Sequence, residues 1–377
     1  MGTYRKIRIG VLTSSRADFG IYLPLLNAMR ADEMFSTDLI VFGTHLSPYH
    51  GRSVDEIIRN GFEVKYKISS LLISDDAESI ASSFAITAGK FAEFWSTHQS
   101  SFDFVFCLGD RFEMAAAVLA GVPLNIAFVH LHGGETTLGA IDNIYRHTIT
   151  VASRIHFVAA EPFRQRVLAL AGTDAACFVS GALSLDNLNG IQFLSREEFE
   201  ARWNIDLQRN FVLITVHPET VAHKRNEEFV SELVMALEWL VLHRVLVITM
   251  PNTDTDGSKF RQAFQNLKMA NSDRVYLIEN FGTQSYFTCM RHGDFVLGNS
   301  SSGIIEAASF GKYVVNVGDR QKGRLTSANV VNVPFEHNEI VRACSEVFDK
   351  SYLGGNVYKI GNASNMIVTK LKEHVGL

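Results

Sequence analysis

The sequence IRIGVLTSSRADFG, residues 7–20, combines an extended run with the approach to a helix. Ile7–Thr13 is apolar and rich in β-branched residues, which is typical of a strand buried on both faces. The residues after Thr13 are small and polar, and a helical pattern follows at Leu23–Ala31. A strand that passes through a polar turn into a helix is the first half of a βαβ unit.

The same alternation continues over almost the whole chain and predicts an α/β fold. In the first half we predict further strands at Asp38–Gly43, Glu63–Ile68, Phe104–Leu108, Ile126–Leu131 and Ile155–Ala159, with a long helix at Ala77–Thr97. In the second half we predict strands at Phe211–Thr215, Val245–Met250, Val275–Ile278, Phe295–Leu297 and Tyr313–Val317. Helices are predicted there at Glu227–Leu242, Lys259–Leu267, Gly303–Ser309, Asn338–Phe348 and Ala363–His374.

The polar segment 181–209 interrupts this alternation and leads into the charged helical sequence SREEFEARW. The length of 377 residues also favours two domains at roughly 150 residues each. We therefore predict two open α/β domains, residues 1–185 and 186–360, followed by a helix within residues 361–377. Two open α/β domains joined by a short linker leave a cleft, and their ligands bind beyond the carboxyl ends of the strands.

Composition and charge limit the classes of function. The chain has 35 Lys and Arg residues against 40 Asp and Glu residues, a formal net charge of −5, so nothing favours nucleic acid or an anionic membrane as a partner. The cysteines lie far apart without zinc-site spacing, as expected in a reducing compartment. The most apolar stretch, Met114–Leu131, is broken by Gly121, Pro123 and Asn125, which argues against a membrane span. We predict a soluble, cytoplasmic protein without a signal peptide.

Charged residues follow three strands of the first half. Arg16 lies near a helix start, where it and the backbone N–H groups suit an anion; an ordinary N-cap turn is the alternative. Asp110 and Arg111 follow the fourth strand, which suits a site that handles protons and phosphates, or else a surface ion pair. Glu135 and Asp142 follow the fifth strand, and with Asp110 they are placed to act as acid and base at one cleft.

The pair His130 and His132 also allows a metal-dependent hydrolase as an alternative. On a strand the two rings share a face only if the strand continues to residue 132, and Gly133 and Gly134 indicate that it ends. No further ligand cluster with suitable spacing follows. We therefore expect no metal.

The second half carries a turn of glycines and serines, GNSSSG at residues 298–303, between a strand and a helix. Serine hydroxyls and amides at a helix start suit a diphosphate, although a plain helix cap would also explain them. Glu306, one turn into that helix, is placed to accept both ribose hydroxyls. His217, Asn252 and Arg320 each follow a strand of the same half. The fingerprints of P-loop and dinucleotide-binding proteins are absent from the sequence.

The motifs SRADFG, GDR, HGGE, IDN-x-YRH, HPET, PNTDTDG, GNSSSG and GDRQKGR occur in this order between residues 15 and 324. In combination they resemble the hydrolysing UDP-N-acetylglucosamine 2-epimerases of the bacterial sialic acid and legionaminic acid pathways. The resemblance implies the glycosyltransferase-B arrangement, in which two Rossmann-like domains face each other across a cleft and the C-terminal helix crosses back to the first domain. One position departs from the sialic acid type, since His132 stands where those enzymes have glutamate.

The resemblance also implies roles for individual residues. The second domain would supply most of the UDP site, and the UDP-binding residues would be Arg16, Arg111, His217, Asn252, Ser300, Ser301, Glu306 and Arg320. The residues that act on the sugar would be Asp110, Glu135 and Asp142, together with the divergent His132.

The implied reaction removes the C2 proton of a UDP-2-acetamido sugar, expels UDP from C1 and hydrates the resulting glycal, and it requires no metal and no nicotinamide. A histidine at position 132 has no fixed charge near pH 7 and can donate or accept. It suits an acetamido group at C4 and a methyl group at C6, so we favour UDP-N,N′-diacetylbacillosamine over UDP-N-acetylglucosamine. Relatives are commonly homodimers or homotetramers. A glycosyltransferase of the same fold and a sugar-nucleotide sensor without activity are the alternatives.

Overall fold

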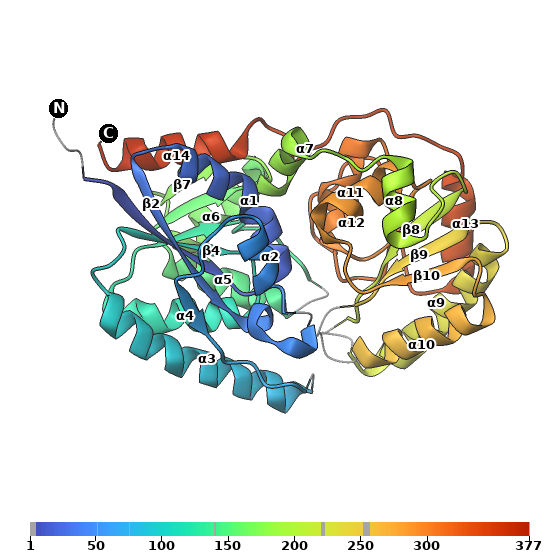
Figure 1. Cartoon of the computed structure of the whole chain (residues 1–377), viewed down its shortest axis with the longest axis horizontal. Helices are drawn as coiled ribbons and strands as arrows, with labels where there is room; N and C mark the ends of the chain where they lie inside the picture. Colours follow the sequence, from blue (N-terminus) through green and yellow to red (C-terminus); the bar gives the residue numbers. More distant parts are fainter. Residues whose placement is uncertain are drawn as a thin grey trace. The chain divides into compact units, whose positions relative to one another are not determined.

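Two parallel β-sheets organise the chain, and each has its own hydrophobic cores (Figure 1). This computed structural model describes residues 5–50, 52–74, 76–138, 141–219, 223–251 and 257–376. Unit 1 comprises Met1–Glu135, Asp142–Asn189 and Tyr358–Leu377, and unit 2 comprises Thr136–Ile141 and Gly190–Val357. The predicted class, an α/β fold with two Rossmann-like halves, is confirmed.

Unit 1 contains a seven-stranded parallel sheet in the order β3-β2-β1-β4-β5-β6-β7. The strands are β1 (Ile7–Thr13), β2 (Phe35–Phe42), β3 (Tyr66–Ile68), β4 (Phe104–Leu108), β5 (Phe128–Leu131), β6 (Ile155–Val158) and β7 (Ala176–Val179). The direction of winding reverses between β1 and β4. Ligands of doubly wound sheets bind outside the carboxyl ends of the strands at such a reversal.

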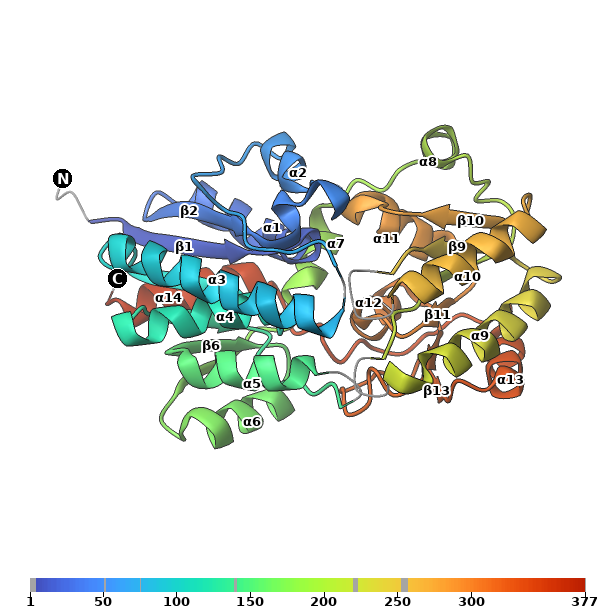
Figure 2. The same cartoon turned by 90° about the horizontal axis from the view of Figure 1, so that it is seen from below.

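Helices cover both faces of the sheet of unit 1. They are α1 (Arg16–Ala31), α2 (Val54–Arg59), α3 (Ala77–His98), α4 (Phe112–Gly121), α5 (Asp142–Ala152), α6 (Glu161–Ala171), α7 (Asn187–Gly190) and α14 (Ala363–His374). Side chains alternate along the strands: Ile9 and Val11 join a core with α1, α2 and α14, whereas Leu12 joins a core with α3, α4 and α5. On that second face α3 and α4 lie side by side (Figure 2).

Unit 2 repeats this plan with a six-stranded parallel sheet in the order β10-β9-β8-β11-β12-β13. The strands are β8 (Phe211–Thr215), β9 (Val245–Thr249), β10 (Val275–Ile278), β11 (Val296–Gly298), β12 (Val314–Val317) and β13 (Val330–Val333). The helices are α8 (Arg196–Trp203), α9 (Asn226–Val241), α10 (Gly257–Ala270), α11 (Gly282–His292), α12 (Ser301–Ile305) and α13 (His337–Val347). The winding here reverses between β8 and β11.

Short 3₁₀ turns complete the chain: η1 (Gly43–Leu46), η2 (Pro48–His50), η3 (Val122–Leu124), η4 (Leu183–Asp186), η5 (His223–Arg225) and η6 (Ala307–Phe310). Within the described residues, no helix is both long and apolar enough to cross a membrane.

The helix α14 belongs to unit 1, although unit 2 precedes it in the sequence. Its Ile367 and Leu371 are buried in the core that also contains α1. Asp186 accepts hydrogen bonds from the backbone N–H of Ala363 at 3.1 Å and of Ser364 at 2.6 Å, and from the Ser364 hydroxyl at 2.6 Å. These bonds explain why Asp186–Asn189 groups with unit 1, beyond the predicted boundary at residue 185.

Several predicted elements differ from the observed ones. The strands β7 and β13 were not predicted. Both are four-residue edge strands with partly exposed side chains, although the sequence of β13, VVNV, is the same as that of the predicted strand β12. The helix α1 begins at Arg16, seven residues before the predicted Leu23, because Ser15 and Asp18 form a capping box. The predicted helix Gly303–Ser309 is instead the five-residue α12 followed by η6.

Candidate active site

The predicted residues of unit 1 all lie in loops or helix starts that follow the carboxyl ends of strands. Arg16 opens α1 after β1, and Asp110 and Arg111 lie between β4 and α4. The loop after β5 carries His132 and Glu135. The remaining predicted residue, Asp142, is the first residue of α5. Parallel strands end at the same edge of their sheet, so the fold collects these side chains along one edge.

His132 and Glu135 form a buried pair in this loop. The Nδ1 atom of His132 lies 2.8 Å from Oε1 of Glu135, whose side chain is 2 % exposed. The other ring nitrogen, Nε2, is buried and has no hydrogen-bond partner within the described part of the chain. A carboxylate on one ring nitrogen fixes the ring and leaves the other nitrogen for a proton of a substrate.

The backbone of this loop is unusual. His132 has φ of +63°, a backbone conformation that residues other than glycine adopt only at a cost in free energy. Its N–H donates to the carbonyl of Phe157 at 3.0 Å, which holds the turn onto the neighbouring strand β6. Gly134 has φ of +75°, and a Cβ atom there would lie 2.3 Å from the carbonyl oxygen of Phe163. Gly134 therefore permits the turn that brings the His132 ring next to Glu135.

His130 serves the structure of the same region. Its Nε2 lies 2.9 Å from the Gly109 carbonyl oxygen and its Nδ1 lies 3.2 Å from the Thr150 hydroxyl, so both nitrogens are engaged. Burial lowers the pKa of His130 to about 3, so the ring is neutral. No group of three or more His, Cys, Asp or Glu side chains in the described ranges is arranged to hold a metal ion. The ring of His130 instead fixes the turn that precedes Asp110.

Asp110 is held by an ion pair with Arg146 of α5. The Arg146 side chain is only 1 % exposed, whereas that of Asp110 is 22 % exposed. A buried guanidinium requires a carboxylate partner, so Arg146 fixes the position of Asp110 at the sheet edge. Arg146 was not among the predicted site residues; the motif IDN-x-YRH contains it.

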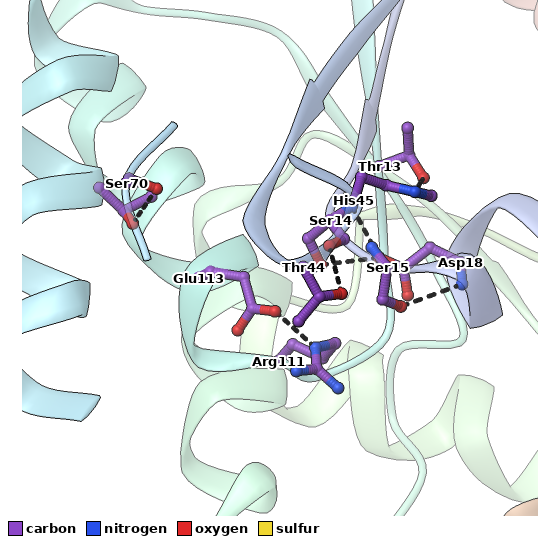
Figure 3. A network of polar contacts seen from close by, with 10 residues as sticks. Thr13, Ser14, Ser15, Asp18, Thr44, His45, Ser70, Arg111 and Glu113 are labelled. Atoms are coloured by element: carbon purple, nitrogen blue, oxygen red, sulfur yellow. Dashed lines mark hydrogen bonds and ion pairs between the residues drawn. The ribbon is translucent and has the colours of Figure 1, made fainter. Parts of the chain in front are cut away.

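A network of short hydrogen bonds fixes the turn between β1 and α1 (Figure 3). The carboxylate of Asp18 accepts from the backbone N–H of Ser14 at 2.9 Å and of Ser15 at 3.1 Å, and from the Ser14 hydroxyl at 2.8 Å. The chain therefore supplies its own anion to these two amides. These two backbone N–H groups are therefore not available to a bound anion. Of the predicted anion-binding groups at this turn, the side chain of Arg16 is the one that remains.

His45, in the turn η1 after β2, is hydrogen-bonded to the end of β1 and so connects the loop after β2 to the loop after β1 (Figure 3). It is fully buried, with Nε2 at 2.8 Å from the Thr13 hydroxyl and Nδ1 at 2.8 Å from the Ser53 hydroxyl. Burial, together with the nearby charges of Arg111 and Arg16, lowers the pKa of His45 to about 4. The two arginines predicted to bind UDP in unit 1 thus lie close to the same neutral imidazole.

Arg111 is oriented by a residue that was not predicted. Its Nε donates to Oε1 of Glu113 at 2.6 Å, and the Glu113 side chain is fully buried. Both residues occur in the sequence GDRFE, two positions apart. The sequence does not show that they pair, because the pairing depends on α4 beginning with the Glu113 side chain buried in the core. Burial also lowers the pKa of Arg16, which faces the carboxylate of Glu56.

In unit 2 the predicted residues again follow strand ends. His217 follows β8, Ser300 and Ser301 follow β11, and Arg320 follows β12. The predicted residue Asn252 lies outside the described residues. The buried side chain of Asn299 joins the first two loops, since its Oδ1 accepts from the His217 N–H and its Nδ2 donates to the His217 carbonyl, each at 2.8 Å.

Glu219 connects the loop after β8 to the loop after β12. Its Oε1 accepts from the Asp319 N–H at 2.6 Å, and burial raises the pKa of this carboxyl group. Arg320 donates to the Pro218 carbonyl at 3.1 Å, and Gln321 donates to the Asn299 carbonyl at 2.7 Å. The three loops that carry His217, the serines and Arg320 are therefore one hydrogen-bonded assembly within unit 2.

The serine turn is partly satisfied by its own side chains. The Ser300 hydroxyl is the N-cap of α12 and accepts from the Ser302 N–H at 3.4 Å. Glu306 is buried at the C-terminal end of this five-residue helix, which corrects its predicted place in the first turn. The predicted helix was too long because the sequence SSGIIEAASF has no glycine or proline between α12 and η6.

Comparison with protein families gives one match over most of the chain. Residues 27–372 match the family described as UDP-N-acetylglucosamine 2-epimerase. The chain belongs to this family. It is thus a member of the UDP-sugar 2-epimerases, as the motif set indicated.

Two curated members of the epimerase family show what this chain is similar to. The "GDP/UDP-N,N'-diacetylbacillosamine 2-epimerase (hydrolyzing)" of Campylobacter jejuni is 33% identical over 92% of this chain and 89% of its own. The "UDP-N,N'-diacetylbacillosamine 2-epimerase (hydrolyzing)" of Legionella pneumophila is 32% identical over 97% and 95%.

A solved structure of the epimerase family has the same fold. The UDP-GlcNAc 2-epimerase of Neisseria meningitidis, bound to UDP-GlcNAc, aligns with a TM-score of 0.81 over 97% of this chain and 100% of its own. The two sequences are 18% identical.

Proposed function

We propose that this epimerase is of the hydrolysing type and converts a UDP-2-acetamido sugar and water into UDP and the free sugar with inverted C2. The observation that carries the proposal is the buried pair of His132 and Glu135, in which one imidazole nitrogen contacts the carboxylate and the other has no hydrogen-bond partner among the described residues. Two relatives at 33% and 32% identity that are named as hydrolysing enzymes support it.

In the proposed first step, Nε2 of His132 takes the proton from C2 of the sugar. The electron pair of the C2–H bond forms the C1=C2 double bond, and the C1–O bond breaks with its pair leaving on UDP. Glu135 stabilises the imidazolium that forms, which is the usual role of a carboxylate behind a histidine base.

In the second step the oxygen of water bonds to C1 of the glycal and one of the water protons passes to a carboxylate, while the electron pair of the C1=C2 bond takes up a proton at C2 on the face opposite to the one that was lost. Asp110 and Asp142 are the carboxyl groups we assign to these proton transfers. Asp110 is only 22 % exposed and is fixed by Arg146, so it would reach the sugar with little freedom to reorient.

We assign the binding of UDP mainly to unit 2. Ser300, Ser301, His217 and Arg320 would hold the diphosphate, and Glu306 would accept the ribose hydroxyls. Arg16 and Arg111 of unit 1 would add positive charge where the diphosphate leaves, which stabilises the developing negative charge. Asn252 completes the proposed UDP-binding set.

The favoured substrate is UDP-N,N′-diacetylbacillosamine, with UDP-N-acetylglucosamine second. An imidazole at position 132 presents an apolar ring edge as well as a hydrogen-bonding nitrogen, which suits a C4 acetamido group and a C6 methyl group better than a carboxylate does. The product would be 2,4-diacetamido-2,4,6-trideoxymannose, or N-acetylmannosamine from the second substrate.

The test is product identification by NMR after reaction of each UDP-sugar in D₂O without any acceptor. We expect UDP, free sugar with inverted C2, and deuterium at C2. Hydrogen retained at C2 would contradict the elimination. UDP release that depends on an added acceptor would instead identify a glycosyltransferase, and binding without turnover would identify a sensor.

A further inference from the structure

A row of hydroxyl groups runs along the carboxyl edge of the sheet in unit 2, and the proposed function gives a role only to Ser300, its last member. It begins at Thr249 and Thr215, the last residues of β9 and β8, whose Oγ1 atoms are 2.7 Å apart. The phenol of Tyr286 on α11 lies 3.4 Å from the Thr215 hydroxyl and 2.6 Å from that of Ser302. The row ends where the Ser302 hydroxyl lies 3.0 Å from that of Ser300.

The Thr249 end of the row fixes the direction of its hydrogen bonds. The Thr249 hydroxyl donates to the Ile214 carbonyl at 3.2 Å, and each hydroxyl has a single proton. Thr215 must therefore donate to Thr249, and it can only accept from Tyr286. The Tyr286 proton is left with two possible acceptors, Thr215 at 3.4 Å and Ser302 at 2.6 Å, and the shorter contact is the stronger hydrogen bond.

The choice made by Tyr286 decides what Ser300 can offer. If Tyr286 donates to Ser302, then Ser302 donates to Ser300, and the Ser300 proton points out of the row. If Tyr286 donates to Thr215, the serine protons point inward along the row and Ser300 has no proton to offer outward. A diphosphate accepts hydrogen bonds and donates none, so it selects the first arrangement.

We propose that Tyr286 is a positioning residue for diphosphate binding, which donates to Ser302 and thereby directs the Ser300 proton towards the ligand. The inference rests on the proposed function, because it takes UDP as the ligand of Ser300. The pKa of Tyr286 is raised to about 12, chiefly by burial and also by the nearby Glu306, so the phenol keeps its proton. Hydrogen bonds that run in one direction strengthen one another, so the effect reaches Ser300 through Ser302.

The test removes one oxygen atom from the row. We expect Tyr286→Phe to raise the Kd of UDP, measured by calorimetry, by about 3- to 10-fold, the scale of one neutral hydrogen bond. Tyr313→Phe is the matched control: it removes the same atom from a partly buried tyrosine at the amino end of β12, and it should leave the Kd unchanged. Ser302→Ala breaks the row at the next position and should weaken UDP binding to a similar degree.

A double variant separates positioning from general damage to the fold. In a Ser300→Ala background there is no hydroxyl left to direct, so Tyr286→Phe should change the UDP Kd by less than about 2-fold. The same factor in both backgrounds would overturn the proposal, as would an unchanged Kd in the single variant. If the unaltered protein fails to bind UDP, the proposed function itself fails; if it binds and Tyr286→Phe binds equally well, only this inference fails.

Discussion

At the scale of single residues, His132 combines a strained backbone with a buried hydrogen bond. A side chain in the left-handed region costs about 1–3 kcal/mol and persists only where its surroundings determine it. Here the N–H of His132 is held by the Phe157 carbonyl and the ring by Glu135. Strain that is retained at a polar, buried position is what we expect of a group that must meet a substrate at one fixed angle.

Glu135→Gln tests the role of the carboxylate behind His132. The amide keeps the shape of the side chain but cannot stabilise an imidazolium, so we expect kcat to fall at least about 10²-fold while the Kd of UDP is unchanged. Steady-state kinetics and calorimetry measure the two quantities. Glu161→Gln on α6 is the control, because that side chain is exposed in the same unit. Near-normal kcat in Glu135→Gln would remove this residue from the mechanism.

His132→Glu tests the proposed selection of the sugar. A single matched group is worth about 1–3 kcal/mol, so the preference for UDP-N,N′-diacetylbacillosamine over UDP-N-acetylglucosamine should shift by about 10- to 200-fold in kcat/KM towards the latter. Both substrates are measured side by side with both proteins. An unchanged ratio would mean that position 132 does not choose the sugar.

At the scale of elements, the alternation of apolar strands and helices was enough to predict the layers, and the strand-end rule was enough to place Asp110, His217 and Ser300 at sheet edges. The edge strands β7 and β13 were not predicted, although β13 has the same four residues, VVNV, as the predicted strand β12, so a local pattern this short does not decide whether a segment joins a sheet. Their place in the sheets follows from tertiary pairing alone.

The partners of the candidate residues could not be predicted for a related reason. Glu113, Arg146 and His45 contact Arg111, Asp110 and Thr13 through the folded chain, and such pairs need the packing of whole elements. Each of these partners is buried and polar, and in the sequence alone a buried polar residue is indistinguishable from a solvated one.

The loop held by His45 predicts how acid affects stability. His45 has a pKa of about 4 and His130 a pKa of about 3 in the folded protein, against about 6.5 when unfolded. The unfolded chain therefore binds more protons between about pH 4 and 6.5, so stability is full above pH 6.5 and falls as the pH drops through this window. We expect the melting temperature to fall between pH 7 and pH 5.

His45→Gln should flatten this dependence, because it removes one group that contributes up to about 1.4 kcal/mol per pH unit. The variant will be less stable at pH 7, so the measured quantity is the difference in melting temperature between the two pH values. His243→Gln, at an exposed position after α9, is the control and should keep the full dependence. An equal difference in His45→Gln would show that folding does not lower the pKa of His45.

At the scale of the whole molecule, two sheets with the same winding order carry different residues along their carboxyl edges. Unit 1 has the His132–Glu135 pair and the Asp110–Arg146 ion pair, and unit 2 has a row of hydroxyls and one hydrogen-bonded assembly of loops. The helix α14 returns the chain to unit 1 and closes its core against α1.

Leu371→Ala tests whether α14 supports unit 1 alone. Leu371 is fully buried, so the change should cost about 2–5 kcal/mol in the free energy of unfolding of that unit. Hydrogen exchange should show lost protection in unit 1 and unchanged protection in unit 2. Met366→Ala on the same helix removes a side chain that is 37% exposed and should cost within about 0.5 kcal/mol. Equal losses in both units would contradict the division.

The late position of α14 has a consequence during synthesis on the ribosome. The apolar side of α1, with Leu25, Leu26 and Met29, is translated near the beginning, but Ile367 and Leu371, which share its core, emerge only after the whole of unit 2. Until then α1 and α2 cover this side of the nascent sheet only in part, and exposed apolar surface is what chaperones bind and what aggregates. Unit 2 is contiguous in the sequence apart from residues 136–141, so its core does not depend on a segment that is made much later. The protein should therefore depend on chaperones for the half that is made first.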